Sequence, residues 1–402
     1  MPNRKLAGFA IFALIIIQIG TVASHWGDVQ ARRPDFAALY SAAKFFRHSA
    51  PSPEAVEQSK RPVVESEAKS RVDDTEREGM KADLLHPPFE ILLFLPLSFL
   101  PYLTAYFVWL LCNIVMLWMV PLLLWQELGL LQREFHFIAI VYGSMFPVLV
   151  CLVQGQDAIL LLLLLTLCYR AMKDDREFLA GILLALTLFK FQITIPIALL
   201  FLVSRKWKVV NGFACGAATI GIASLALIGV RAAIQYVSIV TSVGLQEPGK
   251  SIDDPALMPN LRGLVLSSMR GAFPGQSLTI LVVVLSAIVL GLAMKWAISN
   301  EDVSLDVKFG FFVAISAVVS YHFFPHNACV VLLPLLLVAK EVGNESLSKY
   351  WRGLLSVAAL GIYLAPNLLP LRIAMPVMAA MILLLSGLLL AYRDDSAKRT
   401  TL

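Results

Sequence analysis

Uncharged apolar segments follow one another along most of this chain, and the first runs from Leu6 to Ala23. About eighteen such residues are enough to cross a bilayer as a helix. Of the 402 residues, 58% are hydrophobic and 15% are charged, whereas soluble domains usually contain about 25% charged residues. The sequence therefore predicts an all-α polytopic membrane protein.

Hydropathy predicts about twelve transmembrane helices. After the first, the candidate segments are Tyr102–Trp125, Phe137–Val153, Ala158–Tyr169, Leu179–Phe189, Ile193–Val203, Val209–Val230, Ser277–Ile298, Phe309–Tyr321, Ala328–Ala339, Trp351–Leu364 and Ile373–Tyr392. Clusters of Lys and Arg lie before the first segment and between later ones, on the side predicted to be cytoplasmic. We therefore expect one domain over residues 1–402, in the cell (plasma) membrane, with both termini cytoplasmic. The alternative for the first segment is a signal peptide cleaved near Ala23.

Two long polar stretches, residues 25–88 and 231–276, are predicted to form extracytoplasmic loops. Within the first, Pro34 to Arg47 has the apolar periodicity of an amphipathic interfacial helix. The mixed-charge residues 54–83 are either a solvated helix or disordered. The run Phe89 to Leu100 is too short to span comfortably, which indicates a re-entrant or interfacial helix.

Asp35 emerges just beyond the first apolar segment, in Arg32-Arg33-Pro34-Asp35-Phe36. A carboxylate at the far membrane surface can act as a base on a lipid-linked substrate. An acidic residue at a helix start is also favoured by the helix dipole alone. The residues by themselves leave both interpretations open.

Polar side chains at the outward ends of short apolar segments are functional candidates, because they are costly at membrane depth unless they face a cavity. Lys190 interrupts one apolar stretch, where it could bind a lipid phosphate or extend to the interface. His322 and His326 are four residues apart, but Pro325 breaks the helix between them and no Glu accompanies them. This pattern favours hydrogen bonding to a phosphate or a sugar over a zinc site, and a simple polar loop is the alternative.

Weaker candidates lie in predicted loops. Arg262 is a natural bidentate partner for phosphate, and Asn260 precedes it. Gln156 follows Gly155, where a tight turn with a polar cap is the alternative. No Gly-x-x-x-x-Gly-Lys loop and no Gly-x-Ser-x-Gly elbow occurs, so ATP-driven transport and serine catalysis are unsupported. The net charge of +5 is carried mostly by the topology-setting clusters, so no nucleic-acid partner is expected.

These elements together resemble the membrane-embedded glycosyltransferases of the GT-C superfamily, specifically glycosyltransferase family 87. The matching elements are, in chain order, Asp35-Phe36 through Tyr40 and Ala42-Ala43; His86-Pro87-Pro88-Phe89; Gly155-Gln156 before Leu160 to Leu165; Ala180-Gly181 and Lys190; Met258 to Gly263; and Tyr321-His322 with His326-Asn327. The family often has His-Asp in the last element. Asn327 therefore excludes a catalytic or metal-binding carboxylate at that position.

The resemblance implies a GT-C-type fold and transfer of a sugar, with mannose expected, from a polyprenyl-phosphate sugar donor to a lipid or glycan acceptor. Transfer would occur on the extracytoplasmic side with inversion. Asp35 would be the general base. Substrate binding would fall to Lys190, Asn260, Arg262, His322, His326, Gln156 and His86. We expect no tightly bound metal ion, since no carboxylate cluster accompanies Asp35 in its loop, although the need for a divalent metal stays open.

Two other classes of function compete with this one. A transporter or flippase for a lipid-linked or polar solute would share the polar groups within the apolar segments, but inverted repeats are common in transporters and none is visible here. A subunit without activity of its own is the third class. Replacement of Asp35 by Asn separates the transferase from both.

Overall fold

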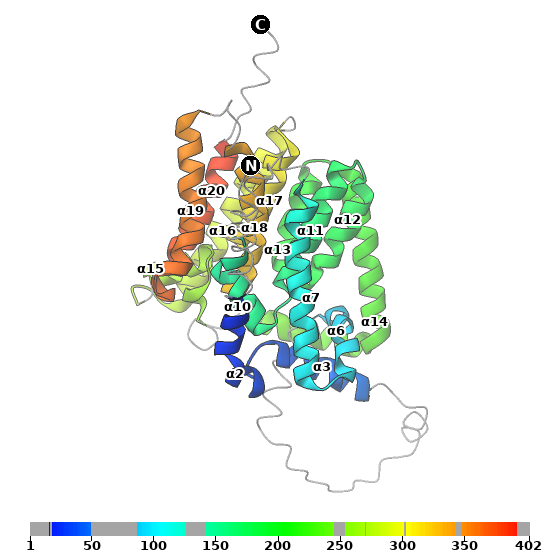
Figure 1. Ribbon diagram of the computed structural model, residues 1–402. Helices are drawn as coiled ribbons and strands as arrows, with labels where there is room; N and C mark the ends of the chain where they lie inside the picture. The colour runs from blue at the N-terminus through cyan, green and yellow to red at the C-terminus, as the bar shows by residue number, and fades with distance from the viewer. Residues whose placement is uncertain are drawn as a thin grey trace.

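The structure is a computed structural model that describes residues 16, 18–49, 87–125, 142–244, 254–269, 271–300, 303–342 and 348–391. The elements within these ranges are α-helices and short 3₁₀-helices (Figure 1). In chain order they are α2 (Trp26–Gln30), α3 (Phe36–Ser49), α6 (Pro88–Phe94), η1 (Pro96–Phe99), α7 (Tyr102–Leu123), α10 (Phe146–Gln154), α11 (Ala158–Lys173), α12 (Glu177–Ala185), η2 (Leu186–Lys190), α13 (Phe191–Val203), α14 (Trp207–Gly244), η3 (Pro255–Leu257), α15 (Leu261–Met269), α16 (Gly275–Ser299), α17 (Leu305–Val319), η4 (Pro325–Val331), α18 (Leu332–Val342), α19 (Lys349–Leu368) and α20 (Leu371–Ala391). The all-α prediction is confirmed.

The predicted count of about twelve spans is not confirmed. Five described stretches are long and apolar enough to cross a membrane, namely Tyr102–Leu123, Glu177–Val203, Trp207–Val230, Gly275–Ser299 and Leu371–Ala391. The pair α10 and α11 would add a sixth, but its two helices are bent by 119°. Several other predicted spans form shorter helices, such as α17 with 15 residues, and a helix of that length falls short of the hydrocarbon thickness.

The stretch Glu177–Val203 folds back on itself. A straight helix of its 27 residues would be about 40 Å long. Nevertheless the Lys206 ammonium, three residues beyond its end, lies 3.0 Å from the Glu177 carboxylate. α12 and α13 are therefore the two arms of a hairpin, and η2 with Lys190 is its turn. This arrangement agrees with the two predicted segments Leu179–Phe189 and Ile193–Val203.

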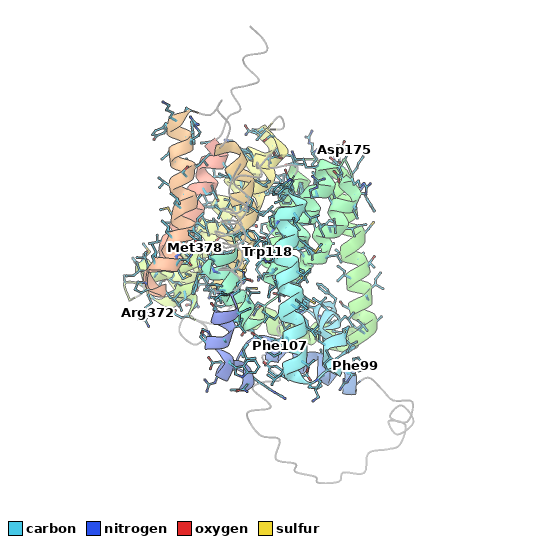
Figure 2. The ribbon with its side chains drawn as sticks, viewed as in Figure 1. Phe99, Phe107, Trp118, Asp175, Arg372 and Met378 are labelled. Carbon is cyan, nitrogen blue, oxygen red and sulfur yellow. The ribbon has the colours of Figure 1, made fainter. Side chains whose placement is uncertain are left out.

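The molecule has two distinct ends. Figure 1 shows α2, α3 and α6 together at the lower end. Figure 2 places Phe99 and Phe107 at this end and Asp175, in the connection from α11 to α12, at the opposite end. Since α11 and the α12–α13 hairpin all have one end in this upper region, their other ends stop inside the molecule. The polar residues at those inner ends are the sequence candidates Gln156 and Lys190.

α3 is the amphipathic helix that the sequence predicts. Phe36, Leu39 and Ala43 on its apolar face are fully buried, and the Phe36 ring contacts those of Phe94 on α6 and Tyr106 on α7. The predicted run Phe89 to Leu100 forms the short helices α6 and η1. Residues 54–83, His86 and most of the first apolar segment lie outside the described residues, although residues 18–24 are helical.

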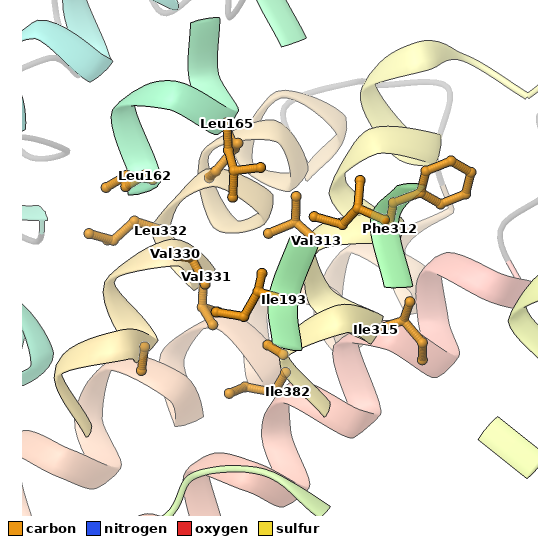
Figure 3. Close-up of a cluster of buried hydrophobic side chains, with 14 of the residues drawn as sticks. Leu162, Leu165, Ile193, Phe312, Val313, Ile315, Val330, Val331, Leu332 and Ile382 are labelled. Atoms are coloured by element: carbon orange, nitrogen blue, oxygen red, sulfur yellow. The ribbon is translucent and has the colours of Figure 1, made fainter. Parts of the chain in front are cut away.

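The principal core is formed by buried apolar side chains of α7, α10, α11 and α13 together with those of α17, η4, α18 and α20. Figure 3 shows part of it, where Ile193 of α13 meets Val313 of α17 and Val331 of η4. α14 also packs closely on α12, because glycines occupy the contact: a Cβ on Gly181 would lie 2.0 Å from the Val209 carbonyl oxygen. Small residues allow this close approach of helices in membrane proteins.

Replacing Gly181 with Leu is expected to force α12 and α14 apart and to destabilise the fold, since overpacking of a tight core costs about 1–3 kcal/mol or more. The measurement is the midpoint of thermal unfolding in detergent. Gly291 on α16 is the matched control, because an added Cβ meets nothing within 4 Å there. A Gly181→Leu midpoint no lower than that of Gly291→Leu would contradict the assigned contact.

Candidate functional site

Asp35 lies at the start of α3 and faces the turn between α10 and α11. Its half-buried carboxylate accepts a 2.6 Å hydrogen bond from the Gln156 side-chain amide, through Oδ2. The other carboxylate oxygen has no hydrogen-bond partner among the described residues. An ionised carboxylate accepts several hydrogen bonds, so this free oxygen can take one from a hydroxyl group.

Gly155 explains why Gln156 reaches Asp35. It ends α10 in the left-handed conformation, with φ of 60°, and a Cβ there would lie 2.8 Å from Cβ of Phe36. Its carbonyl oxygen accepts a 2.8 Å hydrogen bond from the indole of Trp109 on α7. Only glycine combines this backbone conformation with this closeness. The turn is thereby held against α3.

Three buried charged groups lie beside this turn. The Lys190 ammonium is 2.8 Å from Oδ1 of Asp157, whose side chain is fully buried. The Glu90 carboxyl group on α6 acts electrostatically on both Asp157 and Lys190, and Asp35 contributes to the electrostatic field at Lys190. The predicted phosphate ligand Lys190 therefore already has an anionic partner within the protein.

Arg262 and Asn260 belong to a second group of side chains, at the start of α15. Asn260 donates a 2.6 Å hydrogen bond to the Ser320 carbonyl and accepts one of 2.9 Å from the Gly263 amide. These bonds tie α15 to the segment after α17. Asn260 therefore holds the neighbouring arginine in place.

The Arg262 guanidinium is buried and lies 3.9 Å from the centre of the Tyr321 ring. One of its amino groups donates a 3.2 Å hydrogen bond to the Tyr321 carbonyl. No carboxylate in the described ranges forms an ion pair with it. Burial lowers the pKa of Arg262 from its ordinary value, but a guanidinium keeps its charge in proteins. A buried charge without a counter-ion is costly, which points to an anionic ligand.

The two histidines take different positions. The His322 ring lies between those of Tyr321 and Phe324. Burial, with the Arg262 charge as the second cause, lowers the pKa of His322 to about 4, so the ring is neutral near pH 7 and is able to donate one hydrogen bond. Nδ1 of His326 is 3.0 Å from the Gln154 side-chain oxygen. The Phe324 ring is a neighbour of both histidine rings.

Two hydrogen-bond contacts, each made by a residue close in sequence to the first group, join the two groups of side chains. Gln192, two residues after Lys190, donates a 3.3 Å hydrogen bond to the His322 carbonyl. Gln154, two residues before Gln156, contacts His326. The structure thus connects Asp35, Gln156, Lys190, Asn260, Arg262, His322 and His326 in one region, whereas His86 lies outside the described residues. No three His, Cys, Asp or Glu side chains within the described ranges are close enough together to hold a metal ion.

The sequence argument missed two members of this region, Glu90 and Asp157. Each is an isolated acid next to an apolar run, and that isolation is the signal that could have identified them. The expectation about a metal ion considered only the loop that contains Asp35. Glu90 and Asp157 come from two other segments of the chain, and both act electrostatically on Lys190, as Asp35 does.

Comparison with known proteins gives one match. The family model described as "Glycosyltransferase family 87" matches residues 84–320 of this chain. No curated protein and no solved structure matches the chain significantly. The matched range includes every candidate group except Asp35, His322 and His326.

Proposed function

Since the chain belongs to glycosyltransferase family 87 and is therefore a glycosyltransferase, we propose that it moves a sugar from a polyprenyl-phosphate-linked donor to a lipid or glycan acceptor. The single observation that carries this proposal is the Asp35 carboxylate, which Gln156 orients while one of its oxygens stays free. Family membership also favours a transferase over the alternative of a transporter or flippase.

Asp35 is the general base in this proposal. Its free oxygen takes the proton of the acceptor hydroxyl as that oxygen attacks the anomeric carbon. The bond from the anomeric carbon to the phosphate oxygen breaks on the opposite face, so the configuration inverts. The lipid phosphate leaves with the bonding electron pair, and the proton passes from Asp35 to water or to the departed phosphate.

Arg262 is the residue best suited to hold that phosphate, because it is buried, charged and without a carboxylate partner in the described ranges. Fixed donors aimed at developing negative charge stabilise the transition state. His322 and Lys190 would add a hydrogen-bond donor and a positive field, while Asn260 positions Arg262. His86 keeps its predicted role in substrate binding.

Buried polar atoms without partners support a sugar as the group that is transferred. Among the described residues these include Oε1 of Gln156, the hydroxyl of Tyr321 and Oδ1 of Asn327. Buried polar groups in proteins are nearly always hydrogen-bonded, and the hydroxyls of a sugar would supply such partners. We propose mannose as the sugar on the family resemblance, with His326 and Gln156 among its ligands.

The orientation in the membrane is also a proposal. Basic residues including Arg170, Lys173, Arg176 and Arg205 lie at the upper end of the molecule, near Asp175. The positive-inside rule favours a cytoplasmic position for this end. We place the protein in the plasma membrane with both termini cytoplasmic, and the site toward the extracytoplasmic end.

An apolar groove beside the site supports a lipid-linked substrate. It has a volume of about 550 Å³ and lies between residues 18–26 and α7, with Val22, Trp26, Phe107, Ile114 and Leu152 among its lining residues. Leu152 is four residues before Gln156, and its carbonyl accepts a hydrogen bond from Tyr106. A polyprenyl chain in this groove would place its phosphate near the α10–α11 turn.

Replacing Ile114 with Trp is expected to fill the groove and to raise KM for a long-chain donor roughly tenfold. KM for a donor with a short prenyl chain should change little, because that chain does not need the groove. Val115→Trp is the matched control, since Val115 is exposed on the same helix and does not line the groove. Equal changes for long-chain and short-chain donors would contradict the assignment.

The experiment that tests the proposed function is incubation of the purified protein with polyprenyl-phosphate-mannose and a mixture of membrane lipids. Release of polyprenyl phosphate, together with a new glycosylated product, is the expected result. If neither this donor nor other polyprenyl-phosphate sugars lose their sugar in the presence of the protein, the proposed donor class is wrong.

A further inference from the structure

Asp157 and Lys190 form a buried ion pair between two turns of the chain that end inside the molecule. The Lys190 ammonium lies 2.8 Å from Oδ1 of Asp157, and the side chains of the lysine and the aspartate are 10% and 0% exposed. Asp157 is the last residue of the turn between α10 and α11, and Lys190 ends η2, the turn of the α12–α13 hairpin. The ion pair therefore joins the tips of two separate pairs of helices.

The position of Asp157 at a helix start does not account for its side chain. Asp157 is the N-cap residue of α11, where an aspartate commonly accepts a hydrogen bond from an amide of the first turn. Its side chain makes no such bond, and the carboxylate is paired with Lys190 instead. Apolar residues often stabilise a protein as well as a buried ion pair does. Stability alone therefore does not explain two charges at this position, whereas a fixed geometry does.

Lys190 is held in place by hydrogen bonds within the hairpin turn. The Thr194 hydroxyl lies 2.7 Å from the Thr187 carbonyl oxygen and 3.2 Å from that of Lys190, and both threonines are fully buried. Two residues beyond Lys190, Gln192 donates a 3.3 Å hydrogen bond to the His322 carbonyl. The hairpin turn is thus attached to the segment that carries His322, and the ion pair attaches the α10–α11 turn to the same support.

We propose that Asp157 is a positioning residue of the transferase site, whose ion pair with Lys190 fixes the α10–α11 turn so that Gln156 orients Asp35. This inference rests on the proposed function of Asp35, but that function assigns Asp157 no role. Gln156 directly precedes Asp157, and its side-chain amide donates the 2.6 Å hydrogen bond to Asp35. Without the ion pair, the turn can shift, and the carboxylate loses the partner that orients it.

The first test compares Asp157→Asn with Asp306→Asn. Asparagine keeps the shape of the aspartate but removes the charge that attracts Lys190. We expect kcat for sugar transfer to fall at least about tenfold, because small misplacements of catalytic groups are costly, while KM for the donor changes little. Asp306 is the matched control, since this buried carboxylate pairs with Lys173 at the opposite end of α11, near Asp175 (Figure 2). Its replacement should leave kcat near that of wild type.

The second test asks whether Asp157 acts through Gln156. Gln156→Ala removes the hydrogen bond to Asp35 and should itself lower kcat. If Asp157 serves only to hold Gln156, adding Asp157→Asn to Gln156→Ala should lower kcat no further, because substitutions on one path of contacts are not additive. Losses of kcat that simply multiply in the combined variant would show that Asp157 acts independently of Gln156 and would overturn the proposal.

Hydrogen–deuterium exchange of the α10–α11 turn gives a readout that does not depend on transfer. The Gln156 amide donates a 3.0 Å hydrogen bond to the Cys151 carbonyl, which protects it in the folded protein. Exchange of the peptide that contains this turn should become at least about threefold faster in Asp157→Asn, because local opening becomes easier. It should not change in Asp306→Asn.

If Asp157→Asn does not fold, the same exchange is measured in a double variant that combines it with Lys190→Met. This variant removes both charges and so leaves no buried ammonium without its partner. Unchanged exchange of the turn, or equal losses of kcat in Asp157→Asn and Asp306→Asn, would overturn the role of Asp157. Absence of any transfer by wild type would instead overturn the proposed function, while the exchange rates still decide whether Asp157 fixes the turn.

Discussion

Replacement of Asp35 with Asn is expected to lower kcat by about 10³-fold, because general-base catalysis contributes about 10²–10⁴-fold. The amide cannot accept the proton of the acceptor hydroxyl, although it preserves the size of the side chain. KM for the donor should change little, since the donor is bound by other groups. The measurement is the steady-state rate of polyprenyl-phosphate release by purified protein in detergent or in lipid vesicles.

Asp28→Asn is the control for this variant. Asp28 lies nearby on α2, and it forms an exposed ion pair with Arg33 at 2.7 Å. Exposed pairs of this kind contribute little to stability, so transfer by Asp28→Asn should match wild type. An Asp35→Asn protein that is folded and transfers sugar at the wild-type rate would exclude Asp35 as the base.

Replacement of Arg262 with Gln is expected to have the second largest effect, on donor binding. Removing one partner of a buried, hydrogen-bonded charge pair costs about 2–5 kcal/mol, which corresponds to a Kd for polyprenyl phosphate at least about 30-fold higher. The free protein should not lose stability to the same extent, because Arg262 has no carboxylate partner in the described ranges. Titration with polyprenyl phosphate and thermal unfolding measure the two effects separately.

Two further variants sharpen this prediction. Arg262→Lys keeps the charge but loses the planar, bidentate donor geometry, so it should restore only part of the affinity. Arg33→Gln removes an exposed arginine and should leave the affinity unchanged. If Arg262→Gln bound polyprenyl phosphate as tightly as wild type, a phosphate contact with Arg262 would be ruled out, whatever its effect on folding.

Much of the local structure could be predicted from the sequence because it depends on nearby residues. The apolar face of α3 follows from its helical periodicity, and the hairpin turn at Lys190 follows from a polar interruption between two short apolar runs. The number of spans could not be predicted in the same way. Hydropathy measures how apolar a segment is, whereas the 119° bend between α10 and α11 depends on Gly155 and on the helices packed around it.

In the candidate site, too, some features could be predicted from the sequence and others could not. Asp35, Lys190 and Arg262 could be selected because a charged residue beside an apolar segment is costly unless it has a function or a partner. Which of them has a partner could not be predicted: Lys190 pairs with Asp157, while Arg262 has no carboxylate partner in the described ranges. The role of principal phosphate ligand therefore moves from Lys190 to Arg262 in the proposed mechanism.

The sequence by itself determined that this protein is an all-helical membrane glycosyltransferase with an acidic residue just beyond its first apolar segment, because hydropathy and short motifs are local properties. Only the tertiary structure decided which side chains contact that acidic residue. Asp35 and Gln156 are 121 residues apart in the chain, and Glu90, Asp157 and Lys190 come from three elements. Such contacts depend on where helices bend and end inside the bundle, which the packing of the whole chain controls.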